Sequence, residues 1–242
     1  VLIRVVEFYL KLAFRHNKYT IMIPINEFIE TNNSCVLVKT DFKVDLESLT
    51  QFFDSKVFKI KKTYQGTKRH GGWSVQSNTG KISDGWQAGG SPGLTDEQVK
   101  KMFRDGMKFQ TPTALYHGAI EQLMHELAEK QFDAKRTRFA DLEPKAGCGW
   151  HIDGGYDIKK YGFWRGHIAL KTNPKCLFMF KSRDEQHVLS YNIPADGYLY
   201  LANINYSHRI ENTSDESRIH ILTDSALPIS SFQANVEPIL SF

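Results

Sequence analysis

Cysteine is scarce in this sequence of 242 residues, which contains only Cys35, Cys148 and Cys176. The three are odd in number and far apart, and no Cys-x-x-Cys pair occurs. The sequence therefore predicts neither a disulfide framework nor a cysteine-based zinc site. Such sparse cysteine is typical of a reducing compartment, so we expect a cytoplasmic protein.

A long apolar run is also missing. The apolar start, residues 1–10, carries Arg4 and Glu7 and falls short of the roughly 20 uncharged residues that span a bilayer. It lacks the small-residue cleavage site of a secretory signal as well, so we interpret it as a partly buried helix or a leader without function. We expect no membrane partner.

Neither charge sign dominates, because 31 Lys and Arg stand against 27 Asp and Glu, a formal net charge of +4. This excess is too small to indicate a nucleic-acid partner, and we expect none. One local cluster of basic residues is interpreted as a solvated face rather than a binding patch: Lys59, Lys61, Lys62, Lys68 and Arg69.

Short strands are what the second half of the chain does contain. From about Lys135, eight β-rich segments alternate with turn-forming residues, which favours a double-sheet jelly roll of the cupin-like kind. We expect one domain over 1–242, mainly β within the α+β class, with a core at 135–224 and N-terminal helices flanking it. The expected strands are 136–143, 148–153, 165–171, 176–181, 187–192, 197–202, 206–212 and 217–223.

The first 134 residues read as mixed support and as the probable substrate region. Residues 35–39 are β-branched and predict a strand, and 45–53 have helical spacing. Two further helices are expected, one with a capping box at Thr95 and one opening at Thr111-Pro112. Between them and the first helix, residues 64–93 are glycine-rich and are expected to be irregular.

A polar set within the strands carries the functional signal. His151 and Asp153 stand two residues apart, so on a strand they face the same side, and the distant His208 could complete three ligands. Two histidines and one carboxylate on one face of a metal are the ligand set of non-haem Fe(II) oxygenases. The sequence thus predicts a metal site, and with it catalysis, at these three residues.

An acidic co-substrate has a matching cation ten residues past His208. Arg218 is predicted to hold the far carboxylate of 2-oxoglutarate, since a guanidinium binds a carboxylate with two parallel hydrogen bonds. Arg165 and His167 share one strand face. They could contact the other end of the co-substrate or assist Arg218.

Several stretches together resemble the aspartyl/asparaginyl β-hydroxylase-like family, nearest its free-standing cis-proline hydroxylase branch. They are Arg136–Pro144, Trp150–Asp153, Gly166–Asn173, Asn205–Asn212 and Arg218–Asp224, so the resemblance covers roughly 135–224. It implies a double-stranded β-helix with Fe(II), 2-oxoglutarate and O2. It also implies His151, Asp153 and His208 as metal ligands and Arg218, Arg165 and His167 as co-substrate contacts.

The expected activity is hydroxylation of an unactivated C–H bond in an amino acid or related small molecule. A residue in a protein or peptide is the alternative substrate, and a non-catalytic β-sandwich binding module is the alternative of another class. Trp73 and Trp86 in the glycine-rich stretch are candidates for a lid over the substrate, or they simply pack on the sheet. Trp150 is a third candidate substrate contact.

Overall fold

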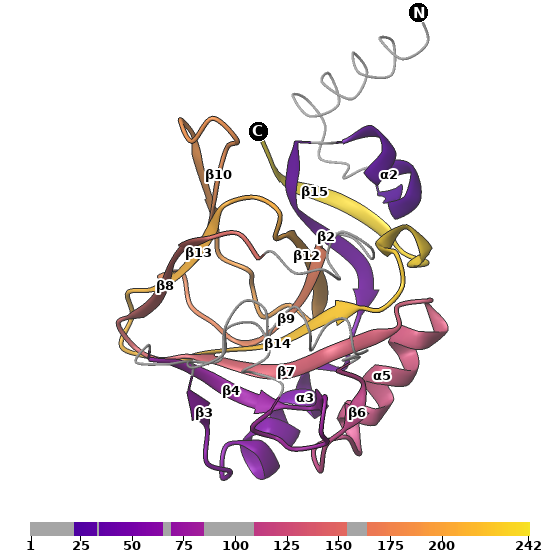
Figure 1. The fold of residues 1–242 in the computed structure, drawn as a ribbon, viewed down its shortest axis with the longest axis vertical. Helices are drawn as coiled ribbons and strands as arrows, with labels where there is room; N and C mark the ends of the chain where they lie inside the picture. Colours follow the sequence, from indigo (N-terminus) through magenta and orange to yellow (C-terminus); the bar gives the residue numbers. More distant parts are fainter. Residues whose placement is uncertain (1–21, 33, 65–68, 85–108, 154–163) are drawn as a thin grey trace, which may run out of the picture.

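The computed structural model describes residues 22–32, 34–64, 69–84, 109–153 and 164–242. Two antiparallel sheets lie face to face (Figure 1). The larger sheet has the spatial order β1 (Ile23–Pro24), β15 (Asn235–Ser241), β2 (Cys35–Lys43), β12 (Tyr198–Asn203), β9 (Trp164–Lys171), β14 (Arg218–Ser225), β7 (Ala134–Leu142), β4 (His70–Ser74) and β3 (Thr63–Tyr64). The smaller sheet has the order β11 (Val188–Tyr191), β10 (Cys176–Lys181), β13 (His208–Asn212) and β8 (Ala146–His151).

The eight strands from β7 to β14 have the connectivity of a jelly roll. Their order is β12-β9-β14-β7 in the larger sheet and β11-β10-β13-β8 in the smaller one, so the chain crosses repeatedly between sheets. Each of the eight expected strands is present, and the bounds agree to within two residues. The prediction of a mainly β jelly roll is confirmed.

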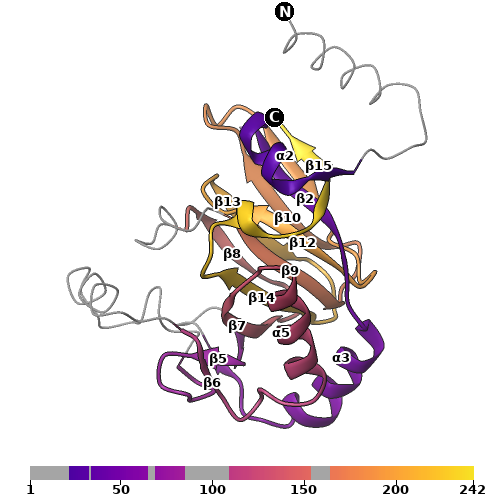
Figure 2. The same cartoon turned by 90° about the vertical axis from the view of Figure 1, so that its right-hand side faces the viewer.

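Three α-helices among the described residues contact the larger sheet, and Figure 2 shows α3 and α5 along one side of it. Successive side chains of a strand point to opposite faces of the sheet, so one face can be apolar and packed against the helices. In β14, Ile219 and Ile221 enter the cluster that the helices share, whereas Arg218 and His220 face the opposite way, between the sheets. The helical elements are α2 (Ile25–Thr31), α3 (Leu46–Phe52) continued by a π-helical turn (Phe53–Val57), α5 (Ala119–Glu129) and a 3-10 turn (Ile229–Ser231).

A second apolar cluster fills the space between the sheets. Ala169 and Tyr200 come from the larger sheet, and Phe178 and Phe180 from the smaller one. Polar residues share this inner space. Four of them are less than 9% exposed: Arg165, His167, His208 and Arg218. Burying so many polar groups costs free energy, which indicates a function for them.

The N-terminal region also belongs to the larger sheet. The predicted strand at 35–39 is confirmed as β2, which lies between β15 and β12. The helix expected at 45–53 is confirmed as α3, and Asp45 caps it by accepting a hydrogen bond of 3.0 Å from the Ser48 backbone.

Two expectations for this region were wrong. Thr111–Pro112 forms a short strand, β6, paired with β5 (Gln76–Ser77), and the helix begins only at Ala119. Strand pairing uses this backbone: the Thr113 amide donates to the Val75 carbonyl over 2.9 Å. The stretch 64–93 is not irregular throughout, because His70–Ser74 forms β4 of the larger sheet.

Several expectations fall outside the described residues: the N-terminal helix or leader, the helix expected at Thr95, and Trp86. In the part of the chain that the structure describes, no helix combines the length and apolar character needed to cross a membrane.

Candidate metal site between the sheets

Strands β8 and β13 of the smaller sheet bring the two histidines together. His208 pairs with His151 across the sheet, and their ring centroids lie 4.4 Å apart. Asp153 follows β8, and its backbone amide donates to the Ile204 carbonyl over 3.2 Å. One possible ligand atom from each of the three residues lies within 4.8 Å of the others. The structure therefore brings together the predicted set His151, Asp153 and His208.

Backbone carbonyls fix the tautomer of both histidines. The Nδ1 of His151 lies 2.8 Å from the Gly149 carbonyl oxygen, and the Nδ1 of His208 lies 2.9 Å from that of Tyr206. Because a carbonyl oxygen only accepts, each Nδ1 carries the proton and each Nε2 presents a lone pair. The Nε2 atoms lie 3.7 Å and 3.9 Å from the two oxygens of Asp153. Three electron-pair donors thus converge.

Charge states at neutral pH suit a cation at this point. Burial is the main cause that lowers the pKa of His208 to about 4, so its imidazole is neutral. Burial works to raise the pKa of Asp153, but Arg165 and the two histidines outweigh it and hold that pKa well below its ordinary value. Asp153 is therefore a carboxylate, and the set can bind a metal ion without first losing a proton from either of these groups.

Deeper between the sheets lies a guanidinium that has no counter-ion among the described residues. Arg218 is 3% exposed, and its Nη2 lies 2.7 Å from His220 Nδ1. Among the described residues no carboxylate lies within 4.0 Å of it. Burial lowers the pKa of Arg218 to about 10, and it stays charged at neutral pH. A buried cation of this kind calls for an anion.

Two further imidazoles flank this cation. His167 is 1% exposed, and neither of its ring nitrogens has a hydrogen-bond partner within the described ranges. Its ring centroid lies 5.9 Å from that of His220, whose Nε2 is likewise buried without a partner there. Burial first, and Arg218 second, lower the pKa of both imidazoles well below the usual value. Both are therefore neutral, and each offers a polar atom to a ligand.

Arg165 lies beside the candidate ligand Asp153, and its expected contact with the co-substrate stays a prediction. Its guanidinium contacts the Asp153 carboxylate through Nη1, and its Nε donates to Asp224 over 2.8 Å. Sequence reasoning gave no role to Asp224. Alternation along β14 could have identified it, because 218, 220, 222 and 224 share one strand face.

Trp73 packs away from this site, which corrects its assignment as a substrate contact. It lies opposite Phe139 in the pairing of β4 with β7, its ring centroid is 5.5 Å from that of Phe53, and its Nε1 donates to the Ile60 carbonyl over 2.8 Å. It is 2% exposed and belongs to the cluster under the helices. The alternative that this tryptophan packs on the sheet holds.

Trp150 is corrected in the same way, because it directly precedes His151 on β8 and adjacent strand residues face opposite sides of the sheet. His208 pairs with His151 but Ile210 pairs with Cys148, so Gly149 and Trp150 together oppose one residue, Arg209. The Trp150 ring lies 4.9 Å from the Lys181 ammonium and 5.5 Å from the Arg209 guanidinium carbon. Its ring is thus held between cations on the opposite side of the smaller sheet from His208.

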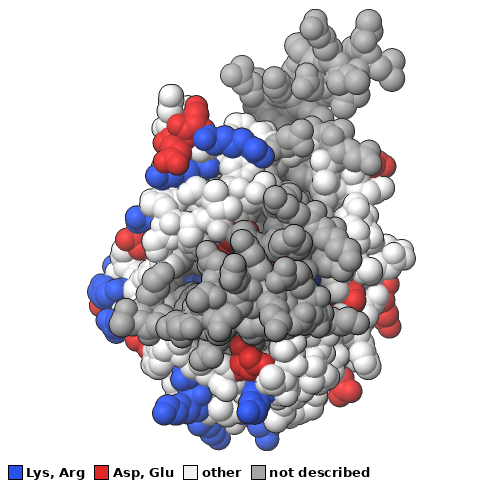
Figure 3. Space-filling model, in the orientation of Figure 1, with Lys and Arg blue, Asp and Glu red and all other residues white. Residues whose placement is uncertain are grey.

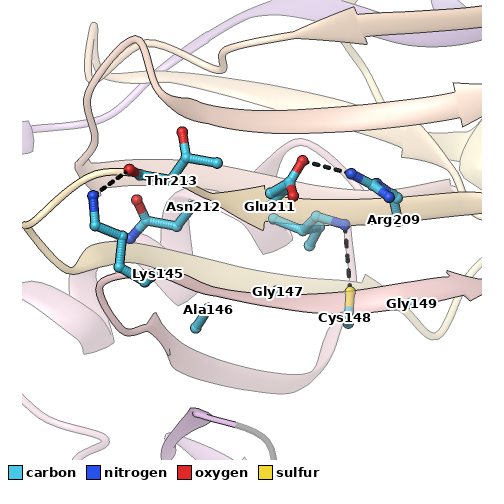
Figure 4. Close-up of a pocket in the computed structure, with 10 residues that line it drawn as sticks. Lys145, Ala146, Gly147, Cys148, Gly149, Arg209, Glu211, Asn212 and Thr213 are labelled. Atoms are coloured by element: carbon cyan, nitrogen blue, oxygen red, sulfur yellow. Dashed lines mark hydrogen bonds and ion pairs between the residues drawn. The ribbon is translucent and has the colours of Figure 1, made fainter.

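A groove of about 420 Å³ also lies along β8 and β13. Figure 4 shows its lining, which runs from Lys145 to Gly149 and from Arg209 to Thr213. None of the three metal-ligand candidates lines it. We therefore do not assign the groove to the site.

The basic cluster near residue 60 is partly neutralised by carboxylates. Lys62 lies 2.6 Å from Asp141 and 2.8 Å from Glu143, and Arg69 lies 3.1 Å from Glu143. Charges of both signs are scattered over the face shown in Figure 3. This agrees with the interpretation of the cluster as part of a solvated, mixed surface.

Comparisons with known proteins give only distant similarities. No family model matches the sequence, and no curated protein matches it. Among solved structures, the capsular polysaccharide assembling protein CapF from Staphylococcus aureus is 16% identical, with a TM-score of 0.26, over 36% of this chain and 23% of that chain. This chain thus spans less than a quarter of CapF.

Two further matches each cover about four fifths of this chain. The non-haem α-ketoglutarate-dependent epimerase SnoN from nogalamycin biosynthesis is 11% identical over 82% of this chain and 81% of that one, with a TM-score of 0.47. A Pseudomonas putida prolyl-4-hydroxylase is 9% identical over 82% and 96%, with a TM-score of 0.44. The function proposed below rests on the side chains and not on these similarities.

Proposed function

We propose that this protein is an Fe(II)- and 2-oxoglutarate-dependent oxygenase that hydroxylates an unactivated C–H bond. The observation that carries the proposal is the convergence of His151, Asp153 and His208, with each imidazole held by a backbone carbonyl in the tautomer that presents Nε2. Two imidazoles and one carboxylate on one face fit Fe(II) and leave further coordination positions open. Bound with 2-oxoglutarate and O2, the iron would supply the oxidant for hydroxylation.

The interior fits 2-oxoglutarate as the second ligand. Arg218 would bind its far carboxylate, because this buried guanidinium has no acidic partner among the described residues. His167 would contact the same molecule, since both of its ring nitrogens are buried without partners in that part of the chain. Arg165 is already engaged by two carboxylates, so we leave co-substrate binding to Arg218 and His167.

Apolar walls would exclude water from this space. The Phe178 ring centroid lies 5.2 Å from that of His167 and 5.6 Å from that of His208, and the Phe180 ring lies 6.2 Å from His208. Both phenylalanines are at most 3% exposed. Access would come from the side of His151, whose side chain is 40% exposed, against 3% for His208. The chain would thus orient the ligands and keep the inner part dry.

We propose a free amino acid or related small molecule as the substrate, in keeping with the resemblance to the aspartyl/asparaginyl β-hydroxylase-like family. A peptide substrate and a non-catalytic binding module are the alternatives that experiment must exclude. The intact set of candidate ligands favours turnover over binding alone, because two imidazoles and one carboxylate leave further coordination positions of a metal open.

Succinate release from 2-oxoglutarate tests the proposal directly. The assay would compare amino acids with peptides as substrates, under air, with Fe(II) added. His208→Ala should abolish release, and His125→Ala on the exposed face of α5 should not change it. Asp153→Gly tests the carboxylate, and we expect loss of activity. Succinate release that persists in His208→Ala would contradict the assignment of His208 as a metal ligand. A wild-type protein that releases no succinate with any substrate would favour the non-catalytic binding module.

A further inference from the structure

Arg165 bridges two carboxylates, one of which is a candidate metal ligand. Its Nη1 contacts Asp153, while Nε lies 2.8 Å from Asp224 Oδ1 and Nη2 lies 3.4 Å from Asp224 Oδ2. Arg165 is 8% exposed, so water screens these contacts poorly. The result is a chain of contacts from Asp224 through Arg165 to Asp153.

Strand register fixes this chain in the fold. Asp224 of β14 stands directly opposite Arg165 of β9, and the two side chains face the space between the sheets. Two side chains of opposite charge that stand directly across from each other on neighbouring antiparallel strands stabilise the sheet. Asp153 lies outside any strand, and Arg165 is its only cationic side-chain partner within 4.0 Å apart from the histidines, among the described residues. Arg165 is thus the contact that orients this carboxylate.

Orientation decides which oxygen is available to a metal. Arg165 engages Oδ2 of Asp153, and Oδ1 lies 3.7 Å from His151 Nε2. An Arg165 without Asp224 would place a full positive charge beside a cation site and would compete with the metal for both oxygens. Asp224 takes the Nε and Nη2 edge of the guanidinium and offsets its charge. Within the described ranges, Arg136 and Arg138 are the other cations near Asp224, and both add to the positive charge that Asp224 offsets.

We infer that Asp224 is a positioning residue for the metal site. It acts through Arg165 to hold Asp153 as a ligand that offers one oxygen to the metal. This inference rests on the proposed function, because it concerns the same three ligands. It assigns Asp224 and Arg165 to support of the metal ligand, and neither to the co-substrate.

Mn(II) affinity provides a readout that does not depend on activity. The free ion would be counted by electron paramagnetic resonance during titration of the purified protein. Removing a partner behind a metal ligand weakens metal binding roughly 10- to 100-fold. We expect a loss of about 10-fold for Asp224→Asn, which keeps the shape of Asp224 and removes its charge. Asp224→Glu keeps the negative charge, so this variant should retain most of the wild-type affinity for Mn(II).

Asp141 provides a matched control. It is a buried carboxylate on β7 that pairs with Lys62 at 2.6 Å, and it shares a strand face with Phe139, under the helices. Asp141→Asn should lower the melting temperature of the metal-free protein and leave Mn(II) affinity unchanged. Equal losses of affinity in Asp224→Asn and Asp141→Asn would reduce the role of Asp224 to general stability and overturn the inference.

A double-mutant cycle tests action through Arg165. Arg165→Lys keeps the charge but loses the planar fork that binds two carboxylates together, so it should also weaken Mn(II) binding, whether or not Asp224→Asn folds. Adding Asp224→Asn to Arg165→Lys should then cause little further loss. Full additivity, or an unchanged affinity in both single variants, contradicts the inference while the proposed function stands. Wild-type protein that binds no Mn(II) contradicts both.

Discussion

Arg218 donates a hydrogen bond over 2.7 Å to Nδ1 of His220, and this imidazole is its only hydrogen-bond partner among the described residues. Because Nδ1 accepts this hydrogen bond, the ring proton of neutral His220 lies on Nε2. This Nε2 is buried and has no hydrogen-bond partner among the described residues. A charged guanidinium and a neutral N–H group therefore lie side by side in the interior. Such a pair destabilises the ligand-free protein and suits the binding of an anion.

Replacing Arg218 by Met should separate function from stability. Because the buried charge has no acidic partner in the part of the chain that the structure describes, Arg218→Met should leave the free energy of unfolding of the ligand-free protein unchanged or raise it by about 1 kcal/mol. Affinity for 2-oxoglutarate should fall roughly 10- to 100-fold, the worth of hydrogen bonds to a charged group. Urea denaturation and calorimetric titration of the Mn(II)-loaded protein would measure the two effects.

Lys62→Met is the control for that exchange. Lys62 is paired with Asp141 and Glu143, so its loss leaves two carboxylates without their cation. We expect this variant to be less stable and to bind 2-oxoglutarate normally. A destabilised Arg218→Met with normal 2-oxoglutarate affinity would show that Arg218 has a structural role instead.

Acid should destabilise the metal-free protein through its buried histidines. Burial holds the pKa of His208 near 4 and those of His167 and His220 well below 6.5, so the folded state binds fewer protons than the unfolded state below pH 6.5. The free energy of unfolding should therefore fall as pH drops from about 6.5 toward 4.5, by roughly 1.4 kcal/mol per pH unit for each histidine. Carboxylates with lowered pKa values, such as Asp153, contribute only at lower pH.

Urea denaturation at several pH values in the presence of a chelator would measure this slope. His220→Gln should reduce this slope by one histidine's share. A slope that is the same in His220→Gln and the wild type would mean that His220 is protonated in the folded state at these pH values.

Glycine at position 166 is required by close packing between strands. A Cβ atom there would lie 2.8 Å from Thr223 Cγ2 and 3.0 Å from Leu199 Cδ1, both too close for contact. We expect Gly166→Ala to destabilise the protein by about 1–3 kcal/mol, the usual effect of overpacking. Gly149→Ala is the matched exchange, because a Cβ at that position meets nothing within 4 Å. Comparable losses in both variants, measured by thermal denaturation, would contradict this packing.

Much of the fold and of the candidate site was predictable from the sequence because local chemistry repeats along it. Turn residues separate the eight strands, and alternation places Arg218 and His220 on one face. The three candidate ligands, which the structure brings together, followed from residue type and spacing. The role of Asp224 was not predicted, because its partner Arg165 lies on another strand and only the register brings them together.

The errors have physical causes as well. Pro112 has the form of a helix start, but pairing of Thr111–Pro112 with Gln76–Ser77 outweighs that local preference. Trp73 lies in a glycine-rich stretch that resembles a loop, yet its pairing with Phe139 places it in the core. Trp150 directly precedes His151 on β8, so the alternation that places His151 toward the site places Trp150 on the other face of the sheet.

One titration tests the central claim most directly. Fe(II) and then 2-oxoglutarate would be added to the purified protein without oxygen, while the visible spectrum is followed for the weak charge-transfer band of the chelate. We predict that the band forms in the wild type, is lost in His151→Ala, and needs much more 2-oxoglutarate in Arg218→Met. Folded wild-type protein that gives no band would contradict the assignment of this site to Fe(II) and 2-oxoglutarate.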